Sequence, residues 1–287
     1  MCGSLPVRWR IRGRRLDRSQ GWRPWRVAGA ATTVLQCREC GLIFAHPMPV
    51  PESLGDHYET DAESYFGIER AGAQEGAFQS EIQRARELLP RVDRLRALDV
   101  GAGTGRAMAA LRDAGFDTWG IEPSVSFREV ALQNYGLDPD RIQQVSVAEA
   151  TFPEAAFDFI TFGAVLEHLP DPGRTIERAL SWLRPGGIIH AEVPSSQWLV
   201  GRLLNMYFWM TGSGLVTNLS PMHPPYHLFE FSAESFKRHG ERTGYALAQY
   251  QVLTGDPLVR GLGGSLLRRV MQASGTGMQL VVWLRAA

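Results

Sequence analysis

The sequence contains little cysteine, one lysine and no net charge. Its three cysteines (Cys2, Cys37 and Cys40) among 287 residues are too few for a disulfide scaffold, so we expect a protein of the reducing cytoplasm. Thirty basic side chains balance thirty acidic ones, and hence no overall field draws the chain to nucleic acid or to a membrane. Lys237 is the single lysine, so arginine is simply the usual cation of this chain.

Long, uninterrupted apolar runs are also missing. The first residues lack the apolar core of a secretory signal, and we expect none. The most hydrophobic segment, residues 198–219, is interrupted by Arg202, Asn205 and Asn218, so it falls short of the roughly 20 clean apolar residues of a membrane-spanning helix. We therefore predict no transmembrane segment. We interpret residues 198–228 as an apolar insert that covers a ligand or touches lipid.

Composition divides the chain into three parts. Hydrophobic residues make up 44% and charged residues 21%, as in soluble globular proteins. Residues 1–50 are basic and weakly periodic, and the proline-rich stretch 46–51 indicates an extended linker. Residues 51–90 have a helical pattern that ends at Pro90 and predict a helical linker or cap. Residues 91–287 form the third part, a single domain that carries the apolar insert.

The third part alternates between strand and helix patterns. We expect strands over 95–100, 118–121, 142–147, 157–162, 188–193, 245–252 and 278–284. We expect helices over 106–114, 125–135 with Ser124 as its cap, 175–183 with Pro185-Gly-Gly as its stop, and 233–242 with Ser232 as its cap. Strands separated by helices favour an α/β fold with a doubly wound, mainly parallel sheet.

A glycine-rich turn follows the first of these strands. Gly101, Gly103 and Gly105 stand at alternate positions, and Glu122 comes about 20 residues beyond the turn. Such glycines let the backbone approach a ligand, and an acid at this spacing reaches ribose hydroxyls. The pattern indicates a site for a nucleoside-bearing cofactor. The alternative is a tight turn between strand and helix that binds no ligand. The third glycine comes one residue too early for the dinucleotide pattern G-x-G-x-x-G.

The run Asp99-Val-Gly-Ala-Gly-Thr-Gly105 resembles the signature of class I S-adenosylmethionine-dependent methyltransferases. The similarity covers roughly residues 95–284 and continues through four further motifs: Trp119-Gly-Ile-Glu-Pro123, Phe157-Asp-Phe-Ile, 166–172 and 183–194. The resemblance implies a seven-stranded Rossmann-like sheet with a reversed last strand. It also implies S-adenosylmethionine as the cofactor and a methyltransferase activity.

The resemblance assigns roles to the residues of the glycine turn. Gly101 and Gly103 would face the amino-acid end of the cofactor, with Gly105 completing the turn. Asp99 would support the turn, and Glu122 would bind the ribose diol.

The adenine side departs from the family pattern. Many relatives place an aspartate after the third strand, where this chain has Val145-Ser-Val-Ala-Glu149. We therefore expect the backbone of Val147 and Ala148 to meet the adenine, with Glu149 as a weaker candidate. Phe162 and the residues up to Val165 would line the other side of the cofactor.

Three histidines are candidates for a catalytic base. His168 follows the fourth strand, whereas His223 and His227 lie in a proline-stiffened loop after the apolar insert. A base helps if the acceptor is a hydroxyl, and histidine titrates near neutral pH. The alternative for each is a structural histidine. We predict His223 or His227 as the base of O-methylation, on a saccharide, quinone, polyketide or lipid-linked acceptor.

The N-terminal segment carries a zinc-knuckle spacing, Cys37-Arg-Glu-Cys40. It resembles the N-terminal zinc ribbon of a related group of methyltransferases, with Cys2 as the remnant of a truncated first knuckle. Structural zinc is normally four-coordinate, so Cys2, Cys37 and Cys40 leave one position for His46, water or an upstream cysteine. Alternatively, the site has decayed and the three thiols bind no metal.

Two other functions compete with this interpretation. A nicotinamide-dependent oxidoreductase could use the same scaffold, although the glycine spacing argues against it. An RNA-binding zinc-ribbon protein with a methyltransferase-like body is the second, because eight arginines lie between Arg8 and Arg26. We do not expect nucleic acid as a partner, since arginine is the default cation throughout.

Overall fold

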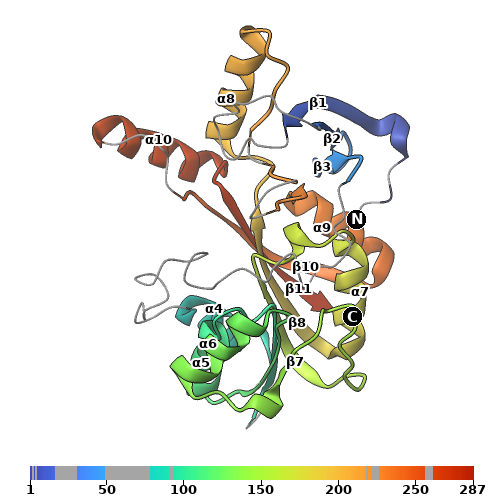
Figure 1. Ribbon diagram of the computed structural model, residues 1–287, viewed down its shortest axis with the longest axis vertical. Helices are drawn as coiled ribbons and strands as arrows, with labels where there is room; N and C mark the ends of the chain where they lie inside the picture. The colour runs from blue at the N-terminus through green and yellow to red at the C-terminus, as the bar shows by residue number, and fades with distance from the viewer. Residues whose placement is uncertain are drawn as a thin grey trace. The chain divides into compact units, whose positions relative to one another are not determined.

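A computed structural model describes residues 1, 3, 5–16, 31–48, 78–90, 94–217, 219–221, 226–255 and 261–287 (Figure 1). The chain divides into two compact units. The N-terminal unit consists of Met1–Val50, Ala164–Gly173 and Glu192–Val282. The core unit consists of Pro51–Gly163, Arg174–Ala191 and Trp283–Ala287.

The larger sheet has seven strands in the order β10-β11-β8-β7-β4-β5-β6. Their bounds are β4 (Arg96–Val100), β5 (Asp117–Ile121), β6 (Ile142–Gln143), β7 (Phe157–Gly163), β8 (Leu183–Pro194), β10 (Tyr245–Leu253) and β11 (Gln279–Ala286). β4 pairs in parallel with β5 and β7, and β5 pairs in parallel with β6. The predicted α/β fold with a seven-stranded, mostly parallel sheet is confirmed.

Seven α-helices lie within the described residues. They are α4 (Gln79–Leu88), α5 (Arg106–Asp113), α6 (Val125–Tyr135), α7 (Pro172–Trp182), α8 (Leu199–Met210), α9 (Ala233–Thr243) and α10 (Gly261–Ser274). Local chemistry sets several ends: Ser124 Oγ accepts the Phe127 N–H before α6, and Ser232 and Ser235 form a reciprocal capping box at α9. No helix in the described part of the chain is both long and apolar enough to cross a membrane.

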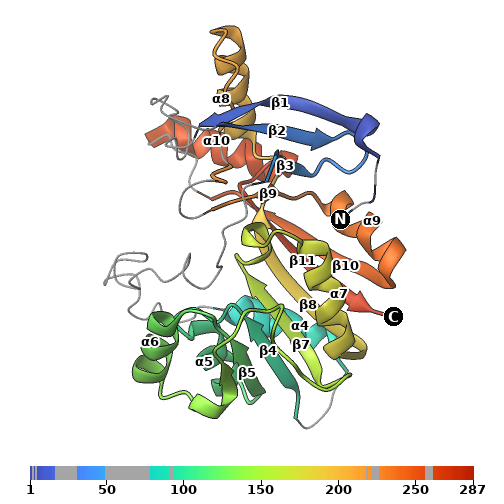
Figure 2. The same ribbon diagram turned by 45° about the vertical axis from the view of Figure 1, so that its right-hand side comes forward.

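The core unit is built around apolar strands. Phe157, Phe159 and Phe162 of β7 are fully buried, as expected for a strand covered on both faces. α5 and α6 lie beside β4 and β5 (Figure 2), where Met108 and Ala131 form one cluster of buried side chains with Ala102, Ala109, Leu137 and Ile142. This packing holds the turn that follows β4.

Most predicted strands agree with the structure to within two residues at each end, but β6 and β8 differ by more. β6 ends at Gln143 instead of residue 147, because Glu149 accepts the Ser146 N–H and hydroxyl and closes a turn there. β8 begins at Leu183 rather than residue 188, so the Pro-Gly-Gly that we took as a helix stop already belongs to the strand. α7 nevertheless ends at Trp182, one residue before the predicted end.

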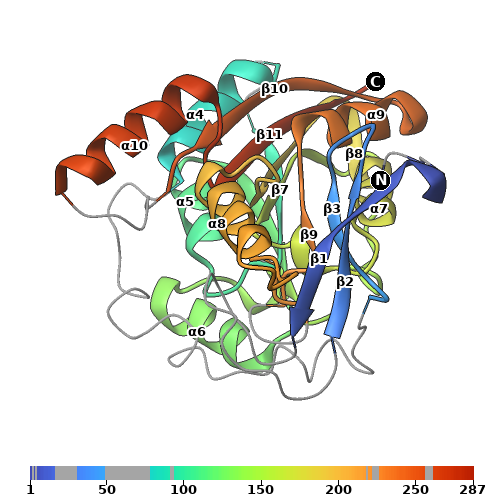
Figure 3. The same cartoon turned by 90° about the horizontal axis from the view of Figure 1, so that it is seen from above.

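The N-terminal unit contains a four-stranded sheet that the sequence did not reveal. Its order is β1 (Trp9–Leu16), β2 (Ala31–Cys37), β3 (Ile43–His46) and β9 (Phe229–Glu230), and all neighbours are antiparallel. α8 of the same unit runs beside β1 in each view (Figures 1 and 3). The predicted apolar insert therefore belongs to the same unit as the basic N-terminal segment.

A buried histidine in the core unit makes the fold sensitive to acid. His190 Nδ1 lies 2.9 Å from Thr161 Oγ1, and the ring contacts those of Phe78 and Trp283. Burial lowers the pKa of His190 to about 3. The unfolded chain, with its ordinary pKa near 6.5, binds the proton first, so stability present above about pH 6.5 is lost as the pH falls towards 3.

We predict that the double variant Thr161→Val/His190→Leu loses part of this acid sensitivity. Between pH 7 and pH 5 the His190 contribution to the free energy of unfolding should fall by about 2 kcal/mol in the native protein and not in the variant. Urea denaturation at both pH values measures the difference. His46→Gln, at an exposed histidine, is the control and should keep the native pH dependence. An unchanged slope in the double variant would contradict the assignment.

Candidate functional site

The turn after β4 has the left-handed backbone that its glycines allow. Gly101, Gly103 and Gly105 have φ values of 71°, 54° and 82°. A Cβ on Gly105 would lie 2.7 Å from both Ala131 Cβ and Leu137 Cδ1, so this glycine is required for packing. A Cβ on Gly103 would meet only the Gly101 carbonyl oxygen, at 4.0 Å. The Gly103 side of the turn is therefore open to a ligand.

Glu122 is joined directly to this turn. Its Oε2 accepts the Gly103 N–H at 2.7 Å, and its Oε1 accepts the Ser124 N–H at 2.8 Å. The carbonyl of Ile121 also accepts the N–H groups of Gly101 and Ala102. The sequence predicted that Glu122 and the glycines share one site, and the structure brings them together. The sequence did not predict the hydrogen bond from the Ser124 N–H to Glu122, because Ser124 was expected only to cap the helix that follows.

Asp99 is buried at the end of β4 beside the same turn. Burial, together with the nearby charge of Glu122, raises the pKa of Asp99 to about 7. Two buried carboxyl groups in one place favour a cationic ligand, because a positive charge would stabilise both ionised forms. S-adenosylmethionine carries a sulfonium and an ammonium group, so these residues fit the cofactor that the family resemblance implies.

The other residues predicted to contact the cofactor differ in how far they are buried. Val147 is buried, and Ala148 and Glu149 are exposed in the turn after β6. The side chain of Phe162 is fully buried within β7, and Gly163 beside it is exposed. Their assignment to the adenine and to the opposite side of the cofactor stays a prediction.

Two of the three candidate histidines come together in the N-terminal unit. His168 ends the 3-10 turn η3 (Leu166–His168), and its ring centroid lies 5.0 Å from that of His227. One ligand atom from each of Glu167, His168 and His227 lies within 4.8 Å of the others. The Leu228 N–H donates to the Glu167 carbonyl at 2.8 Å and fixes the two segments. His223 lies outside the described residues.

Burial changes the proton occupancy of this cluster. The pKa of Glu167 rises to about 8 through burial and, to a smaller extent, the charge of Glu192. Burial lowers the pKa of His227 to about 4. At pH 7 Glu167 therefore keeps its proton and His227 is neutral. The cluster can exchange protons with a hydroxyl group, and its donor atoms could also hold a divalent cation.

Glu167 was not predicted as a site residue, although it lies next to His168 in the motif 166–172. A carboxylate beside a histidine is common in solvated loops, and nothing in the sequence shows that this one is buried. Its burial follows from the pairing of the η3 segment with residues 227–228, which are far away in the chain.

The two knuckle cysteines are buried in the turn between β2 and β3. The Gly41 N–H donates to the Cys37 carbonyl, and Ser232 at the start of α9 donates its hydroxyl to the Cys40 carbonyl. His46 pairs with Thr33, four residues from Cys37 along β2 and hence about 13 Å away. His46 therefore cannot complete a zinc site. Cys2 lies outside the described residues, so the zinc site predicted from Cys2, Cys37 and Cys40 stays a prediction.

Substitutions at two glycines distinguish an effect on cofactor binding from an effect on the stability of the fold. Gly103→Ala should leave the protein folded, at a cost of about 1–2 kcal/mol for the left-handed backbone, and should weaken S-adenosylmethionine about tenfold or more by blocking its approach. Gly105→Ala should instead destabilise the fold by about 2–4 kcal/mol through its close contacts. Urea denaturation and calorimetric titration measure the two effects. Unchanged affinity in Gly103→Ala would show that the cofactor does not approach this turn.

Comparison with known proteins identifies the family of the chain. Residues 71–250, more than half of the chain, match the methyltransferase domain family. The chain is 25% identical over 169 residues to a ubiquinone biosynthesis O-methyltransferase of Azoarcus sp., covering 58% of this chain and 70% of that relative. It is 31% identical over 114 residues to the enzyme of the same name from Paramagnetospirillum magneticum, covering 39% of this chain and only 45% of that relative.

A solved structure shows the same fold. A chain from the complex between the Haloferax volcanii Trm112 methyltransferase activator and its partner methyltransferase superposes with a TM-score of 0.53 at 17% identity. The superposition covers 82% of this chain and 97% of that one. The family match also decides against the oxidoreductase alternative. The chain belongs to the methyltransferase domain family and is an S-adenosylmethionine-dependent methyltransferase.

Proposed function

We propose that the enzyme methylates a hydroxyl group of a small-molecule acceptor. The observation that carries this proposal is the cluster of Glu167, His168 and His227, in which acid and base groups are already assembled. The names of the O-methyltransferase relatives support it at low identity. Amine acceptors need less help from a base than hydroxyls do, so a built base favours oxygen as the acceptor atom.

Within this cluster we assign the proton transfer to His168. Glu167 holds its own proton at pH 7, and His227, with a pKa of about 4, is a weak base. The side chain of His168 is largely buried, with 12% of it exposed, and its Nε2 lies 4.0 Å from Glu167 Oε1. S-adenosylmethionine supplies the methyl group when bound. His168 would accept the proton that the acceptor hydroxyl loses as its oxygen takes up the methyl group.

The acceptor is proposed to carry an apolar part. α8 exposes Leu203, Met206, Tyr207, Trp209 and Met210, and Trp209 is 77% exposed. The insert was expected to cover a ligand or to touch lipid, and this degree of exposure favours contact with an external molecule. A quinone, a polyketide or a lipid-linked saccharide has the required combination of a hydroxyl group and an apolar surface.

We predict that His168→Gln lowers kcat about 100-fold while leaving the affinity for S-adenosylmethionine unchanged. His227→Gln should have a smaller effect. The assay follows S-adenosylhomocysteine with 3,4-dihydroxybenzoate and its dodecyl ester as acceptors, and mass spectrometry locates the methyl group. Methylation only of a matched benzylamine would overturn the proposal. A loss of activity with EDTA would assign the cluster to a cation instead of proton transfer.

The pH profile tests the role of Glu167. Its pKa of about 8 means that the carboxylate forms only above that pH, where it should raise the basicity of His168 and increase kcat/KM. Glu167→Gln imitates the protonated form, so its activity at pH 7 should stay within about threefold of the native value. The variant should lack the rise above pH 8. A rise of the same size in both proteins would exclude Glu167.

A further inference from the structure

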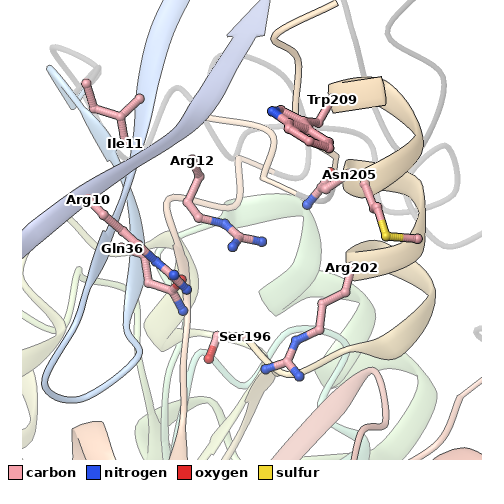
Figure 4. A pocket seen from close by; sticks show the side chains of 9 residues that line it. Arg10, Ile11, Arg12, Gln36, Ser196, Arg202, Asn205 and Trp209 are labelled. Carbon is pink, nitrogen blue, oxygen red and sulfur yellow. The ribbon is translucent and has the colours of Figure 1, made fainter. Parts of the chain in front are cut away.

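The N-terminal unit contains a second candidate binding site, separate from the histidine cluster. It is a cavity of about 630 Å³, a size typical of small-molecule sites. The cavity is lined by Arg10, Ile11, Arg12, Gln36, Ser196, Arg202, Asn205, Met206 and Trp209 (Figure 4). Three of these side chains are arginines, and none of the described lining residues is acidic. The cavity therefore concentrates positive charge.

Arg10 is held in place before any ligand arrives. Its guanidinium donates two hydrogen bonds to Gln36 Oε1, one of them 2.9 Å long from Nε. The side-chain amide of Gln36 in turn donates to the Gly41 carbonyl at 3.2 Å. Gln36 is buried, so this chain of hydrogen bonds fixes the position of the charge at the wall of the cavity.

The charge of Arg12 is only partly compensated. Burial lowers the pKa of Arg12, and the neighbouring charges of Arg10 and Arg202 lower it further, whereas Glu230 acts in the opposite direction. No salt bridge within 4.0 Å is found for Arg12 or Arg202 among the described residues. Figure 4 shows Arg12 extending from β1 and Arg202 from α8 into the same space. An anion placed between them would relieve the repulsion.

The rest of the lining supplies a neutral donor and an apolar surface. Asn205 Oδ1 accepts the Thr217 N–H at 2.7 Å, which leaves the NH2 group of Asn205 as a donor towards a ligand. Ile11, Met206 and Trp209 are largely exposed around the arginines. A ligand that fits this lining has an anionic end and an apolar or aromatic end.

The two walls of the cavity are joined by backbone hydrogen bonds. The Arg14 N–H donates to the Gly214 carbonyl, and the Val216 N–H donates to the Arg14 carbonyl. Val216 also packs with Val34, Ile43 and Leu219 in a buried cluster. The segment that follows α8 is thus attached to β1, which keeps Arg12 and Arg202 facing a common space.

We propose that this cavity binds a phosphate or diphosphate ester that carries an apolar or aromatic group. Guanidinium groups bind phosphate oxygens in pairs of hydrogen bonds, and three of them match a diphosphate better than a single carboxylate. The apolar group would lie against Trp209 and Met206. The binding of this ligand does not depend on the proposed O-methylation. Its further role as the methyl acceptor would rest on that proposed function.

Calorimetric titration of the full chain without S-adenosylmethionine tests the binding. The probes are inorganic diphosphate, uridine diphosphate and farnesyl diphosphate. Arg12→Gln and Arg202→Gln should each weaken all three by about tenfold or more. Arg268→Gln, at an exposed arginine of α10, is the matched control and should bind as the native protein does. No binding of any probe, or an equal loss in Arg268→Gln, overturns the proposal.

Trp209→Ala tests the apolar end. In the native protein the two organic diphosphates should bind more tightly than inorganic diphosphate, and Trp209→Ala should remove this difference in affinity. Tyr250→Ala, at an exposed tyrosine of β10, should leave the difference unchanged. Tighter binding of farnesyl diphosphate supports a lipid-linked ligand, and tighter binding of uridine diphosphate supports a nucleotide-linked one. Equal binding of all three probes would show that the apolar half of the proposal is wrong.

The remaining outcomes separate this proposal from others. Co-sedimentation with phosphatidylcholine–phosphatidic acid vesicles, without binding of soluble diphosphates, would overturn it in favour of a membrane surface. Thermal melting checks that each variant is folded. If diphosphates bind but no hydroxyl acceptor is methylated, the proposed function fails and the cavity assignment stands.

Discussion

The hydrogen bond from the Gly103 N–H to Glu122 is the interaction on which the candidate cofactor site depends. It connects the turn after β4 to the end of β5 through a buried carboxylate. The same carboxylate accepts the Ser124 N–H at the start of α6, so one side chain positions a turn, a strand end and a helix. Parallel pairing of β4 with β5 brings these segments close enough for a short side chain to join them.

Burial keeps several ionisable groups in or near their neutral forms. Asp99 and Glu167 have raised pKa values, and His190 and His227 have lowered ones. In each case desolvation is the largest cause. The consequences differ with the surroundings. His190 is packed among aromatic rings and only affects stability, whereas Asp99 lies beside the open glycine turn and Glu167 beside two imidazoles.

Local chemistry made much of this structure predictable. The glycine turn, the placement of Glu122 beside it, and the caps at Ser124 and Ser232 follow from short stretches of sequence, and the structure contains each of them. The four-stranded sheet of the N-terminal unit was not predicted, because β3 pairs with β9 across more than 180 residues. The burial of Glu167 and the arginine cavity depend on similar long-range pairings, which a periodicity pattern does not contain. β6 was predicted too long, since a side-chain hydrogen bond at Ser146 ended the strand.

The attachment of the segment after α8 to β1 makes the two segments depend on each other. The backbones of Arg14 and Val216 are hydrogen-bonded although they lie far apart in the chain, so β1 and the segment after α8 form one structural module. Removal of β1 would take away the support of that segment, and with it both walls of the arginine cavity. The two segments could therefore be transplanted into another protein only as a pair.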